Sequence, residues 1–128
     1  MEPVDKAEAK GLYGRVVAFD LRKRRIVWTN DRRAAQVSAT LATAGGLLFE
    51  GSNDRTFRAL DSGTGKTLWQ APLNEIPNGF PISYAVGSNQ YVAIVAGGGT
   101  PLAYFTQEKV PEVPRATGAR SIWVFKLK

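Results

Sequence analysis

The segment Thr56–Trp69, with the sequence TFRALDSGTGKTLW, predicts two β-strands joined by a tight turn. Apolar side chains sit among polar neighbours on both sides of its centre, and Thr, Phe, Leu and Trp favour a pleated, half-buried surface. The central residues 61–66 contain two glycines, which accept positive φ, and Asp and Ser side chains that can bond the backbone just after them. We therefore expect a β-hairpin with a short bulged connection.

The same pattern occurs earlier in the chain. Ala18-Phe19-Asp20 precedes Trp28 as Ala59-Leu60-Asp61 precedes Trp69, and both the alanines and the tryptophans are 41 residues apart. A third, partial copy closes the chain, with Val124 and Lys126 in the places of Ala59 and Asp61. A period of about 40–45 residues with one four-stranded sheet per repeat is typical of β-propeller blades. Ordinary hairpins with chance spacing are the less favoured alternative.

The repeats predict an all-β chain that forms a partial β-propeller of about two to three four-stranded antiparallel blades. Propellers have at least about four blades, so we interpret the 128 residues as the C-terminal fragment of a single propeller domain. We expect an irregular lead-in at residues 1–13, a half blade at 14–29 and a full blade at 37–71. A last blade at 80–128 is expected to lack its outer strand.

Individual strands can be assigned within this division. The small and β-branched residues at 36–43 suit an innermost strand, and Glu50 lies on a second strand, where we expect it to face solvent. Residues 90–96 have the strongest β-propensity, and we expect them to be buried on both faces. Residues 98–120 are rich in glycine and proline and predict a long loop before a last strand at residues 121–127.

Composition excludes several classes of site. The chain has no cysteine and no histidine, which rules out disulfides, Cys-based metal sites and His-dependent catalysis. No apolar run approaches the roughly 20 residues of a membrane span, and the polar start is not a signal peptide. The net charge is +6, concentrated at Arg22–Arg25. Without interleaved aromatics this cluster favours a solvated edge or an acidic protein partner over nucleic acid.

The residues 59–69 resemble the tryptophan-docking motif of quinoprotein dehydrogenases, which bind pyrroloquinoline quinone (PQQ). The pattern is Ala59-x-Asp61-x-x-Thr64-Gly65-Lys66-x-x-Trp69. The first repeat keeps Ala18, Asp20 and Trp28 but has Lys23-Arg24-Arg25 where Thr-Gly-Lys is expected. Residues 79–84 and 89–93, GFPISY and NQYVA, are similar to the Gly-x-Pro-x-x-Tyr…Gln-Tyr-Val-Ala run in the last blade of quinoprotein alcohol dehydrogenases. The likeness spans about residues 14–127.

This resemblance implies a segment of a PQQ-dependent dehydrogenase that oxidises alcohols or sugars. It implies PQQ with calcium as cofactors, and it places part of the cofactor-pocket rim at Asn78, Gly79 and Phe80, where the chain enters an inner strand. A simple inter-blade turn is the alternative role for these residues. No catalytic residue and no metal ligand is assigned within the chain. Many alcohol-oxidising members have a tryptophan where this chain has Gln36, so both substrate classes stay open.

The resemblance also implies partners and a location. A cytochrome or a quinone would accept the electrons, and the complete protein would lie in the periplasm. We expect the isolated chain to be inactive and to self-associate through its open strand edges. Two alternatives are a non-enzymatic propeller of the same repeat family that serves as an assembly scaffold, and a free-standing binding module of about three blades.

Overall fold

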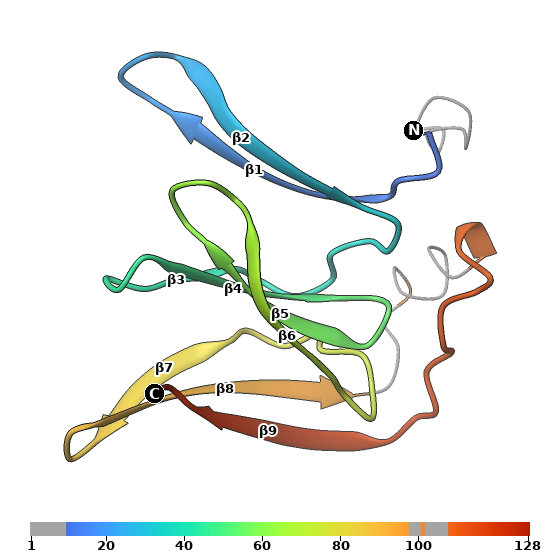
Figure 1. Ribbon diagram of the computed structural model, residues 1–128. Helices are drawn as coiled ribbons and strands as arrows, with labels where there is room; N and C mark the ends of the chain where they lie inside the picture. The colour runs from blue at the N-terminus through green and yellow to red at the C-terminus, as the bar shows by residue number, and fades with distance from the viewer. Residues whose placement is uncertain (1–9, 98–100, 102–107) are drawn as a thin grey trace.

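The computed structural model describes residues 10–97, 101 and 108–128. In this part of the chain, three antiparallel sheets lie side by side in chain order (Figure 1). The first sheet contains β1 (Gly14–Asp20) and β2 (Arg25–Arg32). The second contains β3 (Leu41–Ala42), β4 (Leu47–Ser52), β5 (Thr56–Asp61) and β6 (Thr67–Pro72). The third contains β7 (Ile82–Val86), β8 (Asn89–Gly97) and β9 (Arg120–Lys126). The predicted all-β fold is confirmed.

The β5–β6 hairpin has the bulged connection that its sequence predicts. Asp61 accepts hydrogen bonds from the backbone N–H groups of Gly63 (3.0 Å) and Thr64 (2.7 Å), and a bulge shifts the register between Ala59 and Leu60. The β1–β2 hairpin repeats both features. Its bulge lies between Ala18 and Phe19, at the same place in the repeat. The 41-residue period therefore corresponds to a structural repeat, not to chance spacing.

The second and third sheets enclose the main hydrophobic core. Side chains from the facing sides of β4, β5, β8 and β9 meet there, together with Leu73, which follows β6. The buried members of this core are Phe49, Phe57, Ala59, Leu73, Val92, Ile94 and Ala96. The Phe57 ring stacks at 5.8 Å on both Phe49 and Phe125. Alternate residues of each strand point into this layer, as the pleat requires.

The first sheet packs on the second through Trp28. The indole N–H of Trp28 donates to the carbonyl oxygen of Ser62 at 3.0 Å, and the Asn30 amide donates to the carbonyl oxygen of Gly65 at 2.7 Å. A Cβ on Gly65 would lie 2.3 Å from Trp28 Cε3, so only glycine allows this close approach of ring and backbone.

Trp69, the last residue of the tryptophan-docking pattern, is not a buried core residue, because it is 40% exposed. Its ring meets the edge of Phe125 at 5.0 Å and that of Phe57 at 6.4 Å. The β5–β6 turn of the second sheet lies against the ring of Trp28. The corresponding turn for Trp69 would follow β9, but among the described residues the third sheet ends at β9.

Three other expectations are corrected. Residues 36–43 do not form one strand: Gln36 makes an isolated bridge to Ser52, and pairing resumes only in β3. The N–H groups of Val37 and Ser38 both donate to the carbonyl oxygen of Gly51, which breaks the regular ladder. Glu50 is fully buried. One face of β8 is buried, but the other is buried only in part, since Ala93 is buried and Val95 is exposed.

Parts of two predicted segments, residues 1–9 and most of 98–107, lie outside the described residues. The described remainder of the long loop packs beside the first sheet, where Val110 and Val113 are buried with Ala34. No helix of the described chain has the length and apolar character needed to cross a membrane.

Candidate functional site

Asn78, Gly79 and Phe80 connect the second sheet to β7. The Asn78 side-chain amide donates to the carbonyl oxygen of Gly97 at 3.1 Å, and the Gly79 N–H donates to that of Val95 at 3.2 Å. A Cβ on Gly79 would lie 3.0 Å from Val95 Cβ. Asn78 and Gly79 are thus held along the end of β8. The Phe80 side chain is 81% exposed, which leaves an aromatic ring available at this end of the sheets.

Gly51 brings a second connecting segment close to this one. Its carbonyl oxygen accepts the N–H groups of Val37 and Ser38, which lead into β3, and its N–H donates to Ser38 Oγ at 2.6 Å. A Cβ on Gly51 would lie 2.6 Å from atoms of Pro77. The connection to the second sheet and the connection to the third sheet therefore meet at Gly51. Sequence reasoning missed Gly51, because its role depends on contacts with two segments that are distant in the chain.

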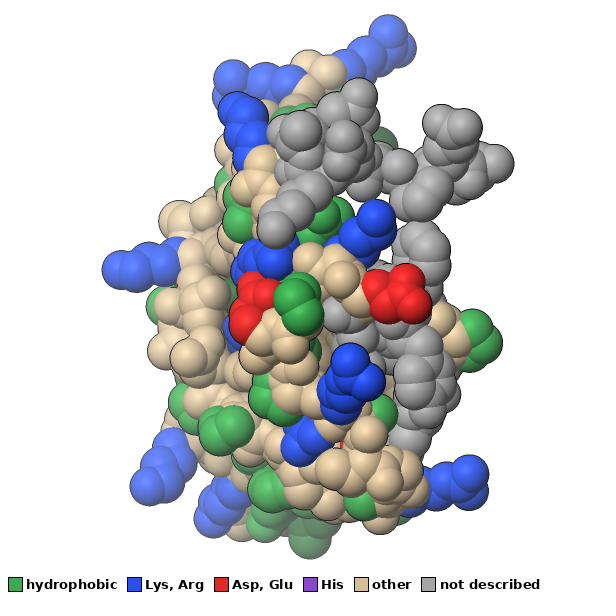
Figure 2. All heavy atoms as spheres, turned by 90° about the vertical axis from the view of Figure 1, so that its right-hand side faces the viewer, with side chains coloured by type: hydrophobic (Ala, Val, Ile, Leu, Met, Phe, Trp, Pro, Cys, Tyr) green, Lys and Arg blue, Asp and Glu red, His purple; other side chains and the backbone are tan. Residues whose placement is uncertain are grey.

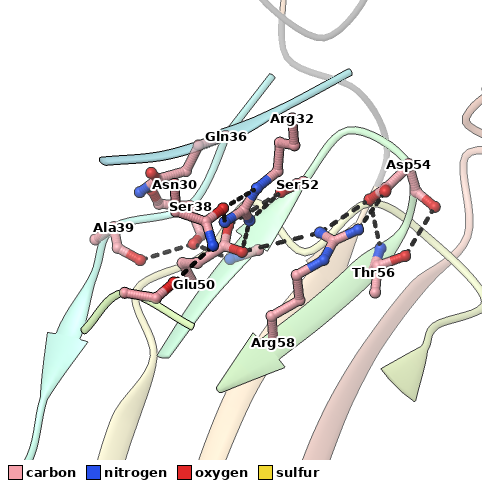
Figure 3. Close-up of polar contacts among 12 residues, drawn as sticks. Asn30, Arg32, Gln36, Ser38, Ala39, Glu50, Ser52, Asp54, Thr56 and Arg58 are labelled. Atoms are coloured by element: carbon pink, nitrogen blue, oxygen red, sulfur yellow. Dashed lines mark hydrogen bonds and ion pairs between the residues drawn. The ribbon is translucent and has the colours of Figure 1, made fainter. Parts of the chain in front are cut away.

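A buried charged network lies beside Gly51 (Figure 3). The Glu50 carboxylate is paired with the guanidinium of Arg32 from the first sheet, and it accepts a hydrogen bond from Ser52 Oγ at 3.0 Å. Arg58, the cross-strand neighbour of Glu50, lies 3.8 Å from the same carboxylate and is also paired with Asp54. Two arginines and two carboxylates balance one another here, which a buried charge requires.

Burial governs the electrostatics of this network. Burial and the neighbouring charge of Arg58 lower the pKa of Arg32 to about 10, while Asp54 opposes this shift. The side chain stays cationic at neutral pH. The prediction that Glu50 faces solvent is wrong because β4 is covered on both faces, by β2 of the first sheet and by the third sheet. The network could be recognised only once the strand register was known, because the register places Glu50 opposite Arg58.

Basic side chains are otherwise dispersed over the end of the molecule where β2 and β8 finish. Figure 2 shows this face with Lys and Arg side chains spread around it and acidic side chains between them. Just after β2, Arg33 forms an ion pair with Glu112, whose carboxylate raises the pKa of the Arg33 guanidinium by accepting its hydrogen bond at 2.5 Å. Within the described ranges, no group of three or more acidic side chains could hold a metal ion.

A separate cavity of about 540 Å³ lies between the second and third sheets. Its walls are mainly apolar and come from β4, β5, β6, β9 and the residues after β9: Leu47, Phe49, Ala59, Leu68, Trp69, Val124, Phe125 and Leu127, with Lys126 and Lys128. Asn78, Gly79 and Phe80 are not among its lining residues. The exposure of Trp69 follows from this cavity.

Antiparallel sheets in series, with Trp28 and Trp69 on the last strands of the first two sheets, are typical of one class of propeller proteins. Residues 2–92 match the family described as "PQQ: Glucose/ethanol/alcohol dehydrogenase, beta-propeller domain". Because this match covers most of the chain, the chain belongs to that family.

Individual relatives are similar over most of this chain. A 1-butanol dehydrogenase (cytochrome c) of Thauera butanivorans is 33% identical over 102 residues, which are 80% of this chain and 15% of that protein. A lanthanide-dependent methanol dehydrogenase of Methylacidiphilum fumariolicum is 39% identical over 88 residues, or 68% of this chain and 14% of that protein. The chain thus spans about one seventh of the length of these relatives.

Solved structures give the same result. The quinohemoprotein alcohol dehydrogenase ADHIIG from Pseudomonas putida HK5 superposes with a TM-score of 0.77 and 28% identity, covering 94% of this chain and 18% of that chain. Most of this chain is therefore similar in fold to one part of a much larger protein.

Proposed function

We propose that this chain forms consecutive blades of a PQQ-dependent dehydrogenase that oxidises alcohols or sugars. The superposition on a quinohemoprotein alcohol dehydrogenase over 94% of the chain is the observation that carries the proposal. The first sheet would be a half blade (residues 14–29), the second a full blade (37–71) and the third a last blade without its outer strand (80–128). Trp28 and Trp69 would dock each blade on the next.

The exposed ring of Phe80 and the neighbouring Asn78 fit a planar quinone at the rim of the propeller channel. PQQ is flat and aromatic and carries carboxylates, so an aromatic face and a side-chain amide are suitable contacts. When bound, PQQ would accept the electrons removed from the substrate. The chain's own part would be to orient the quinone: Asn78 and Gly79 are fixed against β8, and this fixes the position of Phe80.

We assign no catalytic base and no calcium ligand to residues 1–128, so both would come from other parts of the complete protein. Alcohols are favoured as substrates because the relatives described above are named as butanol, methanol and alcohol dehydrogenases. A cytochrome or a quinone is the proposed electron acceptor, in keeping with relatives named for each of them. The periplasm is the proposed location, since the family resemblance implies it.

Substitution of Phe80 in the complete protein tests the proposed rim. Phe80→Ala should raise the PQQ concentration needed for half-maximal reconstitution about three- to tenfold, because it removes one aromatic contact. Val86→Ala, at the other end of β7, is the control, since Val86 is also an exposed apolar side chain. Equal PQQ requirements for the two variants would exclude Phe80 from the cofactor pocket.

A further inference from the structure

The first sheet packs on the second at one junction, and the second packs on the third at another. At equivalent positions the first junction has charged residues and the second has apolar residues. The 41-residue repeat places Leu73 where the first junction has Arg32. The strand registers agree, because Arg15 pairs with Asp31 in the first sheet as Thr56 pairs with Pro72 in the second, and Arg32 and Leu73 are the next residues after Asp31 and Pro72.

The residues opposite these two positions also correspond. In the second sheet, Glu50 pairs with Arg58 one step beyond the pair Phe49–Ala59. In the third sheet, Ile94 pairs with Trp123 one step beyond Ala93–Val124. Since Val124 occupies the place of Ala59 in the repeat, Ile94 corresponds to Glu50 and Trp123 corresponds to Arg58.

The first junction is therefore built on a charged triad, Arg32–Glu50–Arg58. Glu50 has no exposed surface, and the side chains of Arg32 and Arg58 are only 11% and 12% exposed. The second junction is built on an apolar triad, Leu73–Ile94–Trp123, whose members share one hydrophobic cluster. Both triads lie where the outer strand of one sheet meets the middle strands of the next.

An exchange of partners would be unfavourable in both directions. A leucine against Glu50 and Arg58 would leave the buried carboxylate without its principal cation, and breaking a buried pair by removing one partner is strongly destabilising. An arginine against Ile94 and Trp123 would place a buried cation in apolar surroundings. Specificity between similar partners often depends on such a penalty for the wrong partner.

We propose that the two triads encode the order of the sheets. The face of the second sheet that carries Glu50 and Arg58 accepts only a sheet whose outer strand has arginine at the position of Arg32. The face of the third sheet that carries Ile94 and Trp123 accepts only leucine or a similar apolar residue there. This pairing rule uses only residues of this chain and is independent of the proposed enzymatic function.

Hydrogen exchange of the 128-residue chain tests the rule with four proteins: wild type, Arg32→Leu, Glu50→Ile, and the double variant with both changes. Each single variant creates one mismatched pair, and the amides of β1 and β2 should then exchange about 100-fold faster. The double variant reproduces the Leu–Ile pair of the second junction, and Arg58 keeps its ion pair with Asp54. Its β1 and β2 amides should return to within about tenfold of wild type, because matched pairs are tolerated.

The amides of β7–β9 serve as the internal control, since the second junction is unchanged in all four proteins. Glu50→Gln keeps the shape of the side chain and should still accelerate exchange in β1 and β2 about tenfold, so the rule stays testable if a single variant fails to fold. Additive effects of the two single changes, with no recovery in the double variant, would overturn the proposal. Unchanged exchange in Glu50→Gln would overturn it as well.

Discussion

The indole ring of Trp28 lies directly against Gly65, 37 residues further along the chain and in the next sheet. The backbone of Gly65 has a φ of +72°, and a Cβ there would lie 2.3 Å from the ring. Two separate requirements for glycine, one conformational and one steric, therefore coincide at this residue.

Gly65→Ala should destabilise the chain by more than the backbone conformation alone explains. Gly87→Ala is the matched control, because Gly87 also has positive φ (+58°) but has nothing within 4 Å of its Cβ position. The control should cost about 1–2 kcal/mol from the left-handed conformation, and Gly65→Ala should cost at least about 2 kcal/mol more by displacing Trp28. Urea unfolding measures both; equal midpoints would mean that Trp28 does not depend on Gly65.

Trp69→Ala should lower the free energy of unfolding by about 2 kcal/mol, less than the roughly 3–5 kcal/mol typical of a fully buried tryptophan. The reason is that Trp69 is 40% exposed and keeps contact with Phe125 and Phe57 on one side only. Trp69→Phe, which retains an aromatic ring, should recover about half of the loss. A thermal midpoint that is unchanged in Trp69→Ala would show that the ring contributes nothing to the junction.

Glu75 should make the stability sensitive to acid. Burial favours the neutral carboxyl, but hydrogen bonds from Ile76 N–H (3.0 Å), Thr117 N–H (2.7 Å) and the Thr117 hydroxyl (2.8 Å) lower the pKa below its ordinary value of 4.5. A depressed pKa in the folded state stabilises the fold above pH 4.5, and this contribution is lost as the pH falls through the folded value.

Glu75→Gln should therefore flatten the decline in stability below about pH 4.5 and lower stability at neutral pH by about 2 kcal/mol. Glu108→Gln, at an exposed position, is the control. Denaturant midpoints between about pH 3 and pH 7, a range that brackets the ordinary glutamate pKa of 4.5, provide the comparison. Parallel curves for Glu75→Gln and wild type would exclude the link from Glu75 to Thr117.

The hairpin and its repeat could be predicted from the sequence because their signals are local. Asp61, the glycines of the turn and the Trp69 position act within a dozen residues, and the 41-residue period repeats them. The burial of Glu50 could not be predicted, because it depends on the register with β5 and on an arginine from another sheet. The strand expected at residues 36–43 is largely absent because two N–H groups share the Gly51 carbonyl, which no propensity describes.

For the proposed cofactor-pocket rim, the sequence predicted the position in the chain but not the contacts or the exposure of its residues. The sequence pattern placed Asn78, Gly79 and Phe80 before an inner strand, and they do lie before β7. The hydrogen bonds to Gly97 and Val95 and the exposure of Phe80 required the structure. The presence of arginine at position 32 and leucine at the equivalent position 73 of the repeat does indicate, from sequence alone, that the two junctions differ.

The isolated chain should self-associate at micromolar concentration. Strand β9 is paired on one side only within the described structure, and the outer face of the third sheet exposes Ile82, Ile122 (71% exposed) and Val124. Open edges and apolar faces favour pairing with another chain. Light scattering should detect dimers or larger species, and Ile122→Lys with Val124→Lys should reduce them. A monomer peak for the wild-type chain would contradict this expectation.

The most direct test of the central claim, that this chain is a structural part of a quinoprotein dehydrogenase, is an activity measurement with and without the remaining protein. The protein encoded by the complete reading frame that contains residues 1–128 should reduce an artificial electron acceptor with a primary alcohol only after addition of PQQ and calcium. The 128-residue chain alone, treated in the same way, should show no activity. PQQ-independent oxidation or no oxidation by the folded complete protein, or turnover by the isolated chain, would contradict the account.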